Sequence, residues 1–162
     1  MIVLHPSPAR DYEKRRWDKW PELADHLVMK YGAVNFTGTD DQFEYVQSII
    51  KQMHCGHAAA NLCGAFDIPE FAKFLKSAQL IVTVNTATMH LGIVLEVPTV
   101  AIIGGTPAKV VIPRDNPLFG FVEDPALAQW NVAEATYGKP RINEITVEQV
   151  MEKVEEMAGR KP

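Results

Sequence analysis

The stretch over residues 80–105, LIVTVNTATMHLGIVLEVPTVAIIGG, most constrains what this chain can fold into. It contains two apolar runs rich in Val and Ile, residues 80–84 and 99–103, and each has the length of a buried strand. Between them lie a polar turn and a helical segment from about Thr88 to Glu96. A strand, a helix and a second strand in this order predict a βαβ unit, with parallel strands and a right-handed crossover.

The same alternation continues over the rest of the chain. Strands are predicted at 2–5, 34–37 and 61–64, helices at 17–30, 40–53, 68–77 and 145–157, and loops over the proline- and glycine-containing stretch 104–140. The first of these helices places Trp20, Leu23, Ala24 and Leu27 on one face. The pattern therefore predicts a single α/β domain over residues 1–162, a Rossmann-like three-layer fold with a parallel sheet.

Composition narrows the class of protein. The 162 residues are 47% hydrophobic and 22% charged, which suits one globular domain. A net charge of −4 argues against a general nucleic-acid binder, because phosphate tracking needs a basic face. We find neither an apolar run long enough for a membrane span nor a signal peptide, and predict a cytoplasmic protein. The start, MIVLHP, fits either a domain cut from a longer chain or a protein that begins on its first strand.

One segment offers soft metal ligands. His54, Cys55, His57 and Cys63 fall within ten residues. Their spacing matches no structural zinc pattern, and the segment follows a helix rather than a strand. We therefore predict no metal site.

Ligands of parallel sheets bind beyond the carboxyl ends of the strands. The segment NTATMHLG lies at such a place, because it directly follows the predicted strand at 80–84. Its small residues allow close approach to the backbone, and the first amides of the helix have no intrahelical partner. With hydroxyls from Thr86 and Thr88, and a helix dipole that favours anions, the segment predicts a phosphate site. The alternative is that Asn85 to Thr88 only cap the helix, with His90 a packed or capping histidine.

Three further segments follow strands. After the first, HPSPARDYEKRRW carries five cationic side chains: Arg10, Lys14, Arg15, Arg16 and Lys19. They could clamp phosphate, or form a solvated positive helix face. After the second strand, TGTDDQFE offers Asp40 as a helix N-cap. Asp41 and Glu44 could accept hydrogen bonds from sugar hydroxyls, or they could interact favourably with the positive end of the helix dipole. After the last, GGTPAKVVIP lacks both the phosphate-loop spacing and a following helix, although Gly105 and Thr106 allow close ligand approach.

Taken in order, VLHPSPA, ELADHL, FTGTDDQFE, NLCGAFDIPEFAKFL, VNTATMHLG, VPTVAIIGGT and ITVEQVMEKV resemble a known family. The chain is similar to the C-terminal, nucleotide-sugar-binding domain of the ADP-heptose:lipopolysaccharide heptosyltransferases, glycosyltransferase family 9. The resemblance covers about residues 2–107 and the last helix. It implies one half of a GT-B fold and a role in lipopolysaccharide biosynthesis. It also implies inverting transfer from a nucleoside-diphosphate sugar, with an ADP-sugar favoured and no cofactor.

The resemblance also implies roles for individual residues. Lys14 or Arg15 would neutralise the diphosphate leaving group, and Asp41 or Glu44 would contact the nucleoside. Leu62 to Gly64 would border the base. The implied donor-binding residues are Ser7, Asp41, Glu44, Leu62, Gly64, Asn85, Thr86, Ala87, Thr88, Met89, His90, Gly105 and Thr106.

The chain departs from the family pattern in ways that bear on activity. Asn85 stands where the family has an aspartate near the donor sugar, Ala87 replaces a glycine and Gly105 a proline. The family's N-terminal domain, which binds the acceptor and supplies the general base, has no counterpart in this sequence. Catalysis would therefore need an acceptor-binding domain or chain as a partner. The alternative is a non-catalytic nucleotide-sugar-binding or assembly module, and a GT-B nucleotide-sugar epimerase is a less favoured third interpretation.

Overall fold

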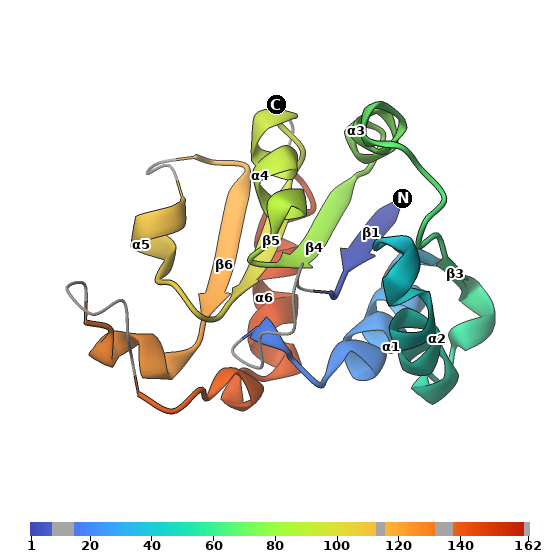
Figure 1. Cartoon of the computed structure of the whole chain (residues 1–162). Helices are drawn as coiled ribbons and strands as arrows, with labels where there is room; N and C mark the ends of the chain where they lie inside the picture. The colour runs from blue at the N-terminus through green and yellow to red at the C-terminus, as the bar shows by residue number, and fades with distance from the viewer. Residues whose placement is uncertain (8–14, 113–115, 132–137, 161–162) are drawn as a thin grey trace.

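The computed structural model describes residues 1–7, 15–112, 116–131 and 138–160 (Figure 1). The strands are β1 (Ile2–His5), β2 (Val34–Phe36), β3 (Ala59–Asn61), β4 (Leu80–Val84), β5 (Thr99–Ile103) and β6 (Phe119–Glu123). The α-helices are α1 (Trp20–Tyr31), α2 (Phe43–Gln52), α3 (Ile68–Lys76), α4 (Ala87–Val94), α5 (Ala108–Val111) and α6 (Val147–Met157). Short 3-10 helices are η2 (Asp40–Gln42), η3 (Gly56–Ala58), η4 (Pro125–Gln129) and η5 (Ile142–Glu144).

The six strands form one sheet in the order β3-β2-β1-β4-β5-β6, and every neighbouring pair is parallel. The chain moves outward from β1 to β3, then crosses back to β4 and continues to β6. The strand order therefore reverses between β1 and β4, which are paired in register from Ile2–Leu80 to His5–Thr83. This is the Rossmann-like arrangement predicted from the sequence, and its ligand crevice opens at the reversal point.

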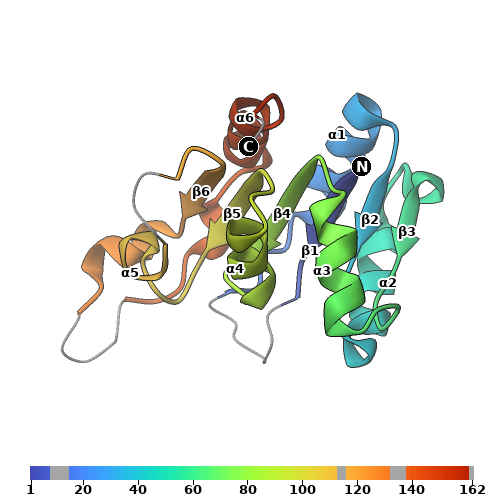
Figure 2. The ribbon, with the colours of Figure 1, turned by 90° about the horizontal axis from the view of Figure 1, so that it is seen from above.

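Alternation along the strands builds a core on each face of the sheet. Ile2 and Leu4 pack into a large cluster with residues of α1, α2 and α6, while Val3 packs with Leu75 of α3 on the opposite face. Successive side chains of a strand point to opposite faces, so a buried parallel strand needs apolar residues throughout. Figure 2 shows α1 and α6 on one side of the sheet and α3 and α4 on the other. The three layers confirm the predicted fold class.

The first helix starts three residues later than predicted. α1 begins at Trp20 because Pro21 occupies its first turn, where a missing amide hydrogen is tolerated. Trp17 precedes the helix, yet it is fully buried, donates from Nε1 to the Ile145 carbonyl at 3.0 Å and meets Trp20 edge-on. The four residues predicted to share a face of α1 are all fully buried.

The structure corrects the sequence prediction at the edges of the sheet. β3 lies at 59–61 rather than 61–64, so the NLCG segment is mainly the turn that leaves the strand. The stretch 104–140, predicted to consist of loops, contains α5, β6 and η4. A short helix does therefore follow GGTP. β6 was missed because Gly120 interrupts its apolar pattern. A Cβ at Gly120 would lie 3.2 Å from Cγ of Met157, so the glycine lets α6 pack closely on this strand.

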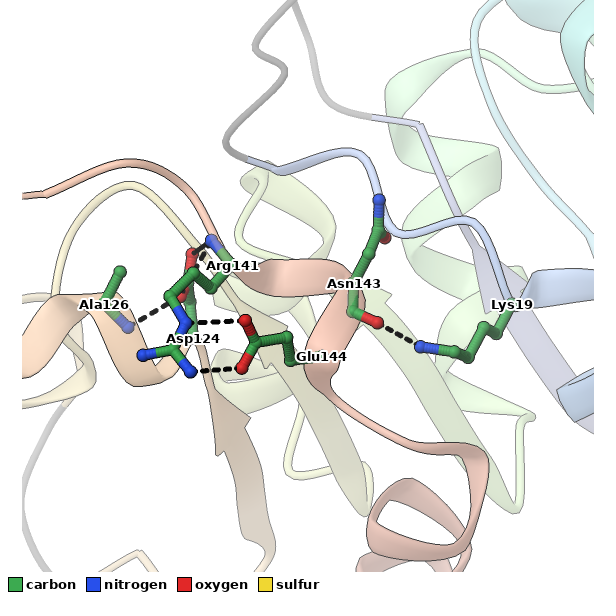
Figure 3. A network of polar contacts seen from close by, with 6 residues as sticks. All are labelled: Lys19, Asp124, Ala126, Arg141, Asn143 and Glu144. Atoms are coloured by element: carbon green, nitrogen blue, oxygen red, sulfur yellow. Dashed lines mark hydrogen bonds and ion pairs between the residues drawn. The ribbon is translucent and has the colours of Figure 1, made fainter.

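A polar network ties the segment after β6 to the start of α1 (Figure 3). Asp124, which is 1% exposed, accepts hydrogen bonds from the amides of Ala126 and Arg141. Arg141 forms an ion pair with Glu144, and Lys19 donates to the carbonyls of Asn143 and Ile145. These contacts hold Lys19, the last cationic residue of the basic segment, at the start of α1.

Candidate functional site

A cavity of about 650 Å³ lies at the carboxyl ends of β1, β2, β3 and β4. This volume is in the range of small-molecule sites, and the position matches the crevice expected for the fold. Its walls are formed by His5 and Ser7, by Thr37 to Asp40 and Gln42, by Leu62, Gly64 and Phe66, by Asp67, Ile68 and Phe71, and by Thr86 to Thr88 and Leu91. Four separate strand ends thus contribute to one pocket.

The start of α4 forms the first polar wall of this cavity. Thr86 is the N-cap residue with extended backbone, but its side chain makes no capping bond and its Oγ1 lies 3.3 Å from Oγ1 of Thr83. The amide of Met89 donates to the carbonyl of Thr86. Among the described residues, the amides of Ala87 and Thr88 have no hydrogen-bond partner. These two amides are therefore available to an anion at the positive end of a helix dipole.

Ser7 adds an unused donor to the same cavity. Its side chain is 2% exposed, and its Oγ has no hydrogen-bond partner in the described part of the chain. A buried polar group without a partner is uncommon, because its desolvation is not compensated. A ligand oxygen in the cavity would satisfy this hydroxyl.

The loop after β2 forms the opposite polar wall. Thr39 is the N-cap of η2 and exchanges side-chain and backbone bonds with Gln42 in a capping box. The predicted cap, Asp40, is instead the first residue of η2, and it lines the cavity. Gly64, with a φ of +73°, brings the next turn against it, and a Cβ there would lie 3.2 Å from Cα of Asp40. Asp40 is thus a cavity residue that the capping interpretation had set aside.

An apolar side closes the cavity over α3. The ring of Phe66 stacks on Phe74 with centroids 4.7 Å apart and on Phe71 at 6.2 Å. Ile68 has 79% of its side chain exposed at the same rim. Such a surface suits a flat, apolar part of a ligand rather than a charged one. These side chains were not among the predicted site residues, because their spacing is that of an ordinary amphipathic helix with its preceding turn.

The structure brings together only some of the predicted donor-binding residues. Ser7, Leu62, Gly64, Thr86, Ala87 and Thr88 line the cavity. Asp41, Glu44, Asn85, Met89, His90, Gly105 and Thr106 do not lie in its described lining. Met89 is buried in a core cluster with Ala101, and His90 is exposed on α4. The binding roles of all these residues remain predictions.

The basic segment is only partly described. Lys14 lies outside the described residues, and Arg15 is half-buried away from the cavity lining. The guanidinium of Arg16 lies 5.6 Å from the ring centroid of Tyr45 on α2, a cation–π contact. No Lys or Arg belongs to the described lining, so the positive potential that described residues give the cavity comes from helix N-termini, the α4 start among them.

The HCGH segment does not build a metal site. Among the described residues, no three or more His, Cys, Asp or Glu side chains lie together in a way that could hold a metal ion. Asp25 instead accepts hydrogen bonds from the amides of His54 and Cys55. Burial, with smaller contributions from Asp40 and Asp41, raises the pKa of the Cys63 thiol to about 11, so it stays protonated.

Within the described ranges, no helix combines the length and apolar composition needed to span a bilayer.

Comparison with known proteins gives the family. The model of glycosyltransferase family 9 (heptosyltransferase) matches residues 1–125. No match was found among curated proteins. A family 9 glycosyl transferase from Veillonella parvula has a similar structure, with a TM-score of 0.80 and 21% identity over 97% of this chain. E. coli ADP-heptose LPS heptosyltransferase II gives a TM-score of 0.77 at 19% identity, and E. coli heptosyltransferase WaaC with ADP gives 0.67 at 18%, each over 97% of this chain.

These structures are longer than the present chain. The matches cover 46%, 46% and 44% of their respective chains, so this chain spans less than half of each. At these identities the structures establish a common fold, and the family model, which matches most of the sequence, establishes the relationship. The chain belongs to glycosyltransferase family 9, the heptosyltransferase family.

Proposed function

We propose that this domain binds a nucleoside-diphosphate sugar as the donor for inverting glycosyl transfer, with an ADP-sugar favoured. The observation that carries the proposal is the cavity at the β1/β4 reversal point, which is lined by Ala87 and Thr88, whose amides have no partner in the described part of the chain. WaaC, a structural relative, is known in complex with ADP. A diphosphate at the α4 start would place the nucleoside toward β2 and β3.

The two sides of the cavity suit the two ends of such a ligand. The amides of α4 and the Ser7 hydroxyl supply donors for phosphate oxygens. The aromatic side over α3 offers Phe66 and Phe71 to a purine ring. A nucleoside diphosphate combines a charged end and a flat apolar end, one for each of these two sides.

The chemistry of this half is stabilisation of the leaving group. As the glycosidic bond to phosphate breaks, negative charge develops on the departing diphosphate. Amides and a helix dipole that already point at this charge stabilise the transition state, because they do not have to reorient during the reaction. Lys14 or Arg15 would add a cation, as predicted from the family pattern.

The transfer itself needs more than this domain. An acceptor hydroxyl has to be placed and deprotonated on the face opposite the leaving group for inversion, and in the family pattern these tasks belong to an N-terminal half. We propose an acceptor-binding domain or chain as partner. Asn85 is 5% exposed, and its Nδ2 has no hydrogen-bond partner among the described residues. It stands where the family pattern has an aspartate, and we expect this exchange to change how the donor sugar is held.

Calorimetric titration with ADP, UDP, GDP and CDP tests the proposal. ADP is expected to bind best. Ser7→Ala should weaken ADP binding about tenfold, because it removes a donor to a charged oxygen. It should leave thermal stability unchanged or higher, since the Ser7 hydroxyl has no partner to lose within the described residues.

Ser48→Ala is the matched control, because its exposed hydroxyl donates to a carbonyl within α2, away from the cavity. It should leave ADP affinity unchanged. If no nucleoside diphosphate binds, or if Ser7→Ala and Ser48→Ala have the same affinity as the parent chain, the proposal is wrong.

A further inference from the structure

His5 is held in one orientation by a hydrogen-bond chain at the edge of the sheet. Its Nδ1 lies 3.0 Å from Oγ1 of Thr37, and that hydroxyl donates to the carbonyl of Leu4 at 3.3 Å. A threonine hydroxyl has one hydrogen, so when it donates to Leu4 it accepts from His5. With the Thr37 hydroxyl hydrogen on Leu4, the proton of the neutral ring sits on Nδ1 and Nε2 carries a free lone pair, and this tautomer is part of the inference.

The other nitrogen is the one open to a ligand. His5 lines the cavity, and its ring packs against Phe71 with centroids 6.2 Å apart. Since Nδ1 is directed at Thr37, Nε2 is the ring nitrogen that a bound molecule can reach. It is an acceptor with no charge, in contrast to the donors at Ser7 and the α4 start.

The surroundings keep the ring neutral. Burial lowers the pKa of His5 to about 4. Among the described residues, the charged groups that line the same cavity are Asp40 from η2 and Asp67 before α3, and the neighbouring strand β4 presents Thr83, which is uncharged. Asp67 Oδ1 is already used as the cap of α3, where it accepts from the Glu70 amide.

The cavity therefore offers two kinds of polar group: the α4 start and Ser7 supply donors, whereas His5 Nε2 and the Asp40 carboxylate supply acceptors. Phosphate oxygens are repelled by bare lone pairs, whereas hydroxyl groups donate to them. We infer that His5 is a ligand-binding residue whose unprotonated Nε2 accepts a hydrogen bond from a sugar hydroxyl of the nucleotide. The inference rests on the proposed function and adds a contact that the sequence pattern did not indicate.

A pair of substitutions isolates the contact. An asparagine amide overlays Nδ1 of histidine, so His5→Asn keeps a donor to Thr37 and removes the acceptor at Nε2. A glutamine amide overlays Nε2, so His5→Gln keeps an acceptor toward the cavity. His5→Asn should bind the ligand that carries the hydroxyl, either ADP or ADP-glucose, three- to tenfold more weakly than the parent chain does, and His5→Gln should lose less affinity.

Deoxygenated ligands identify the hydroxyl. If a ribose hydroxyl is the donor, either 2′-deoxy-ADP or 3′-deoxy-ADP should bind the parent chain more weakly than ADP does, and this difference should vanish in His5→Asn. If the hydroxyl belongs to the transferred sugar, the loss in His5→Asn should appear with ADP-glucose and not with ADP. Either result supports the inference and names the source of the hydroxyl.

Nitrogen NMR of the imidazole separates ligand binding from a purely structural role, because a structural role alone would not make the Nε2 shift respond to the ligand. The Nδ1–H tautomer is expected in the free chain, with an Nε2 shift that moves on ligand binding. An Nε2–H tautomer, or a ring that becomes protonated when ADP binds at pH 7, overturns the inference even if His5→Asn does not fold. If His5→Asn binds both ADP and ADP-glucose with the same affinity as the parent chain, the inference is wrong and the proposed function is unaffected. A parent chain that binds no nucleotide overturns the proposed function with it.

Discussion

The depressed pKa of His5 links the stability of the fold to pH. In the unfolded chain the imidazole has its ordinary pKa of 6.5, whereas burial lowers the pKa to about 4 in the folded chain. Between these values the unfolded chain binds a proton that the folded chain does not. The stabilisation is thus complete above pH 6.5 and is lost as the pH falls toward 4.

The magnitude follows from the two pKa values. Each unit of pH between them changes the free energy of unfolding by about 1.4 kcal/mol, and the dependence flattens near either pKa. Between pH 7 and pH 5 the folded chain should lose about 2 kcal/mol through His5 alone. That is a substantial part of the stability of an ordinary domain.

Urea unfolding of the parent chain and of His5→Gln at pH 7 and pH 5 measures this effect. The glutamine does not titrate, so subtracting its pH dependence from that of the parent chain removes the contributions of carboxylates and other histidines. The remainder should be about 2 kcal/mol of destabilisation at pH 5. If His5→Gln does not fold, His5→Asn serves the same purpose. Equal pH dependence in the parent and the variant would show that the ring is protonated as readily in the folded chain as in the unfolded chain, which contradicts the burial that lowers its pKa.

Three other predictions concern packing and chemistry. Gly92→Ala should destabilise the domain by about 1–3 kcal/mol in urea unfolding, because its Cβ would lie 2.4 Å from Oγ1 of Thr99. Gly159→Ala, with no atom within 4 Å of its Cβ, is the control and should change little. Asp124→Ala should lower stability by about 1–3 kcal/mol, since it leaves the backbone amides of Ala126 and Arg141 without their acceptor; an unchanged unfolding midpoint would contradict this. Cys63, with its pKa raised to about 11, should react slowly with iodoacetamide at pH 8 in a variant lacking the other cysteine. Equal rates in the folded and urea-unfolded chain would refute the burial argument.

The parts of the fold that follow from the sequence are those with uninterrupted local patterns. β4 and β5 carry five apolar or hydroxylic residues each, all buried, and both were predicted within their observed bounds. β6 was missed, because Gly120 breaks its apolar pattern; at the sheet edge three of its five residues are half-buried and Phe121 is exposed. The glycine makes room for Met157 of α6, which is more than thirty residues away in the chain, and a window of ten residues does not contain that information.

The cavity was predictable to a similar degree. The NTAT turn was identified because the pattern of strand, small residues and helix is local, and Thr86 to Thr88 do line the cavity. Asp40 was interpreted as a cap because TGTDDQFE contains several residues able to cap a helix, and only the structure assigns that task to Thr39. Phe66 and Ile68 were not considered, since their role depends on how α3 lies beside the crevice.

The bond between His5 and Thr37 illustrates the limit most clearly. The two residues are 32 positions apart, and each ends or follows a strand whose residues look like those of any buried strand. Parallel pairing of β1 and β2 places Leu4 opposite Phe36, so the residues after them, His5 and Thr37, come within hydrogen-bond reach. The register of the two strands thus orients the imidazole, and the orientation decides which nitrogen faces the ligand.

Thr37→Val tests this step, because it removes the acceptor for Nδ1. Both tautomers should then become populated in the free chain, as nitrogen NMR would show, and ADP affinity should fall even though Nε2 is still present. A single Nδ1–H tautomer in Thr37→Val would mean that the ring is oriented by packing against Phe71 rather than by the hydroxyl.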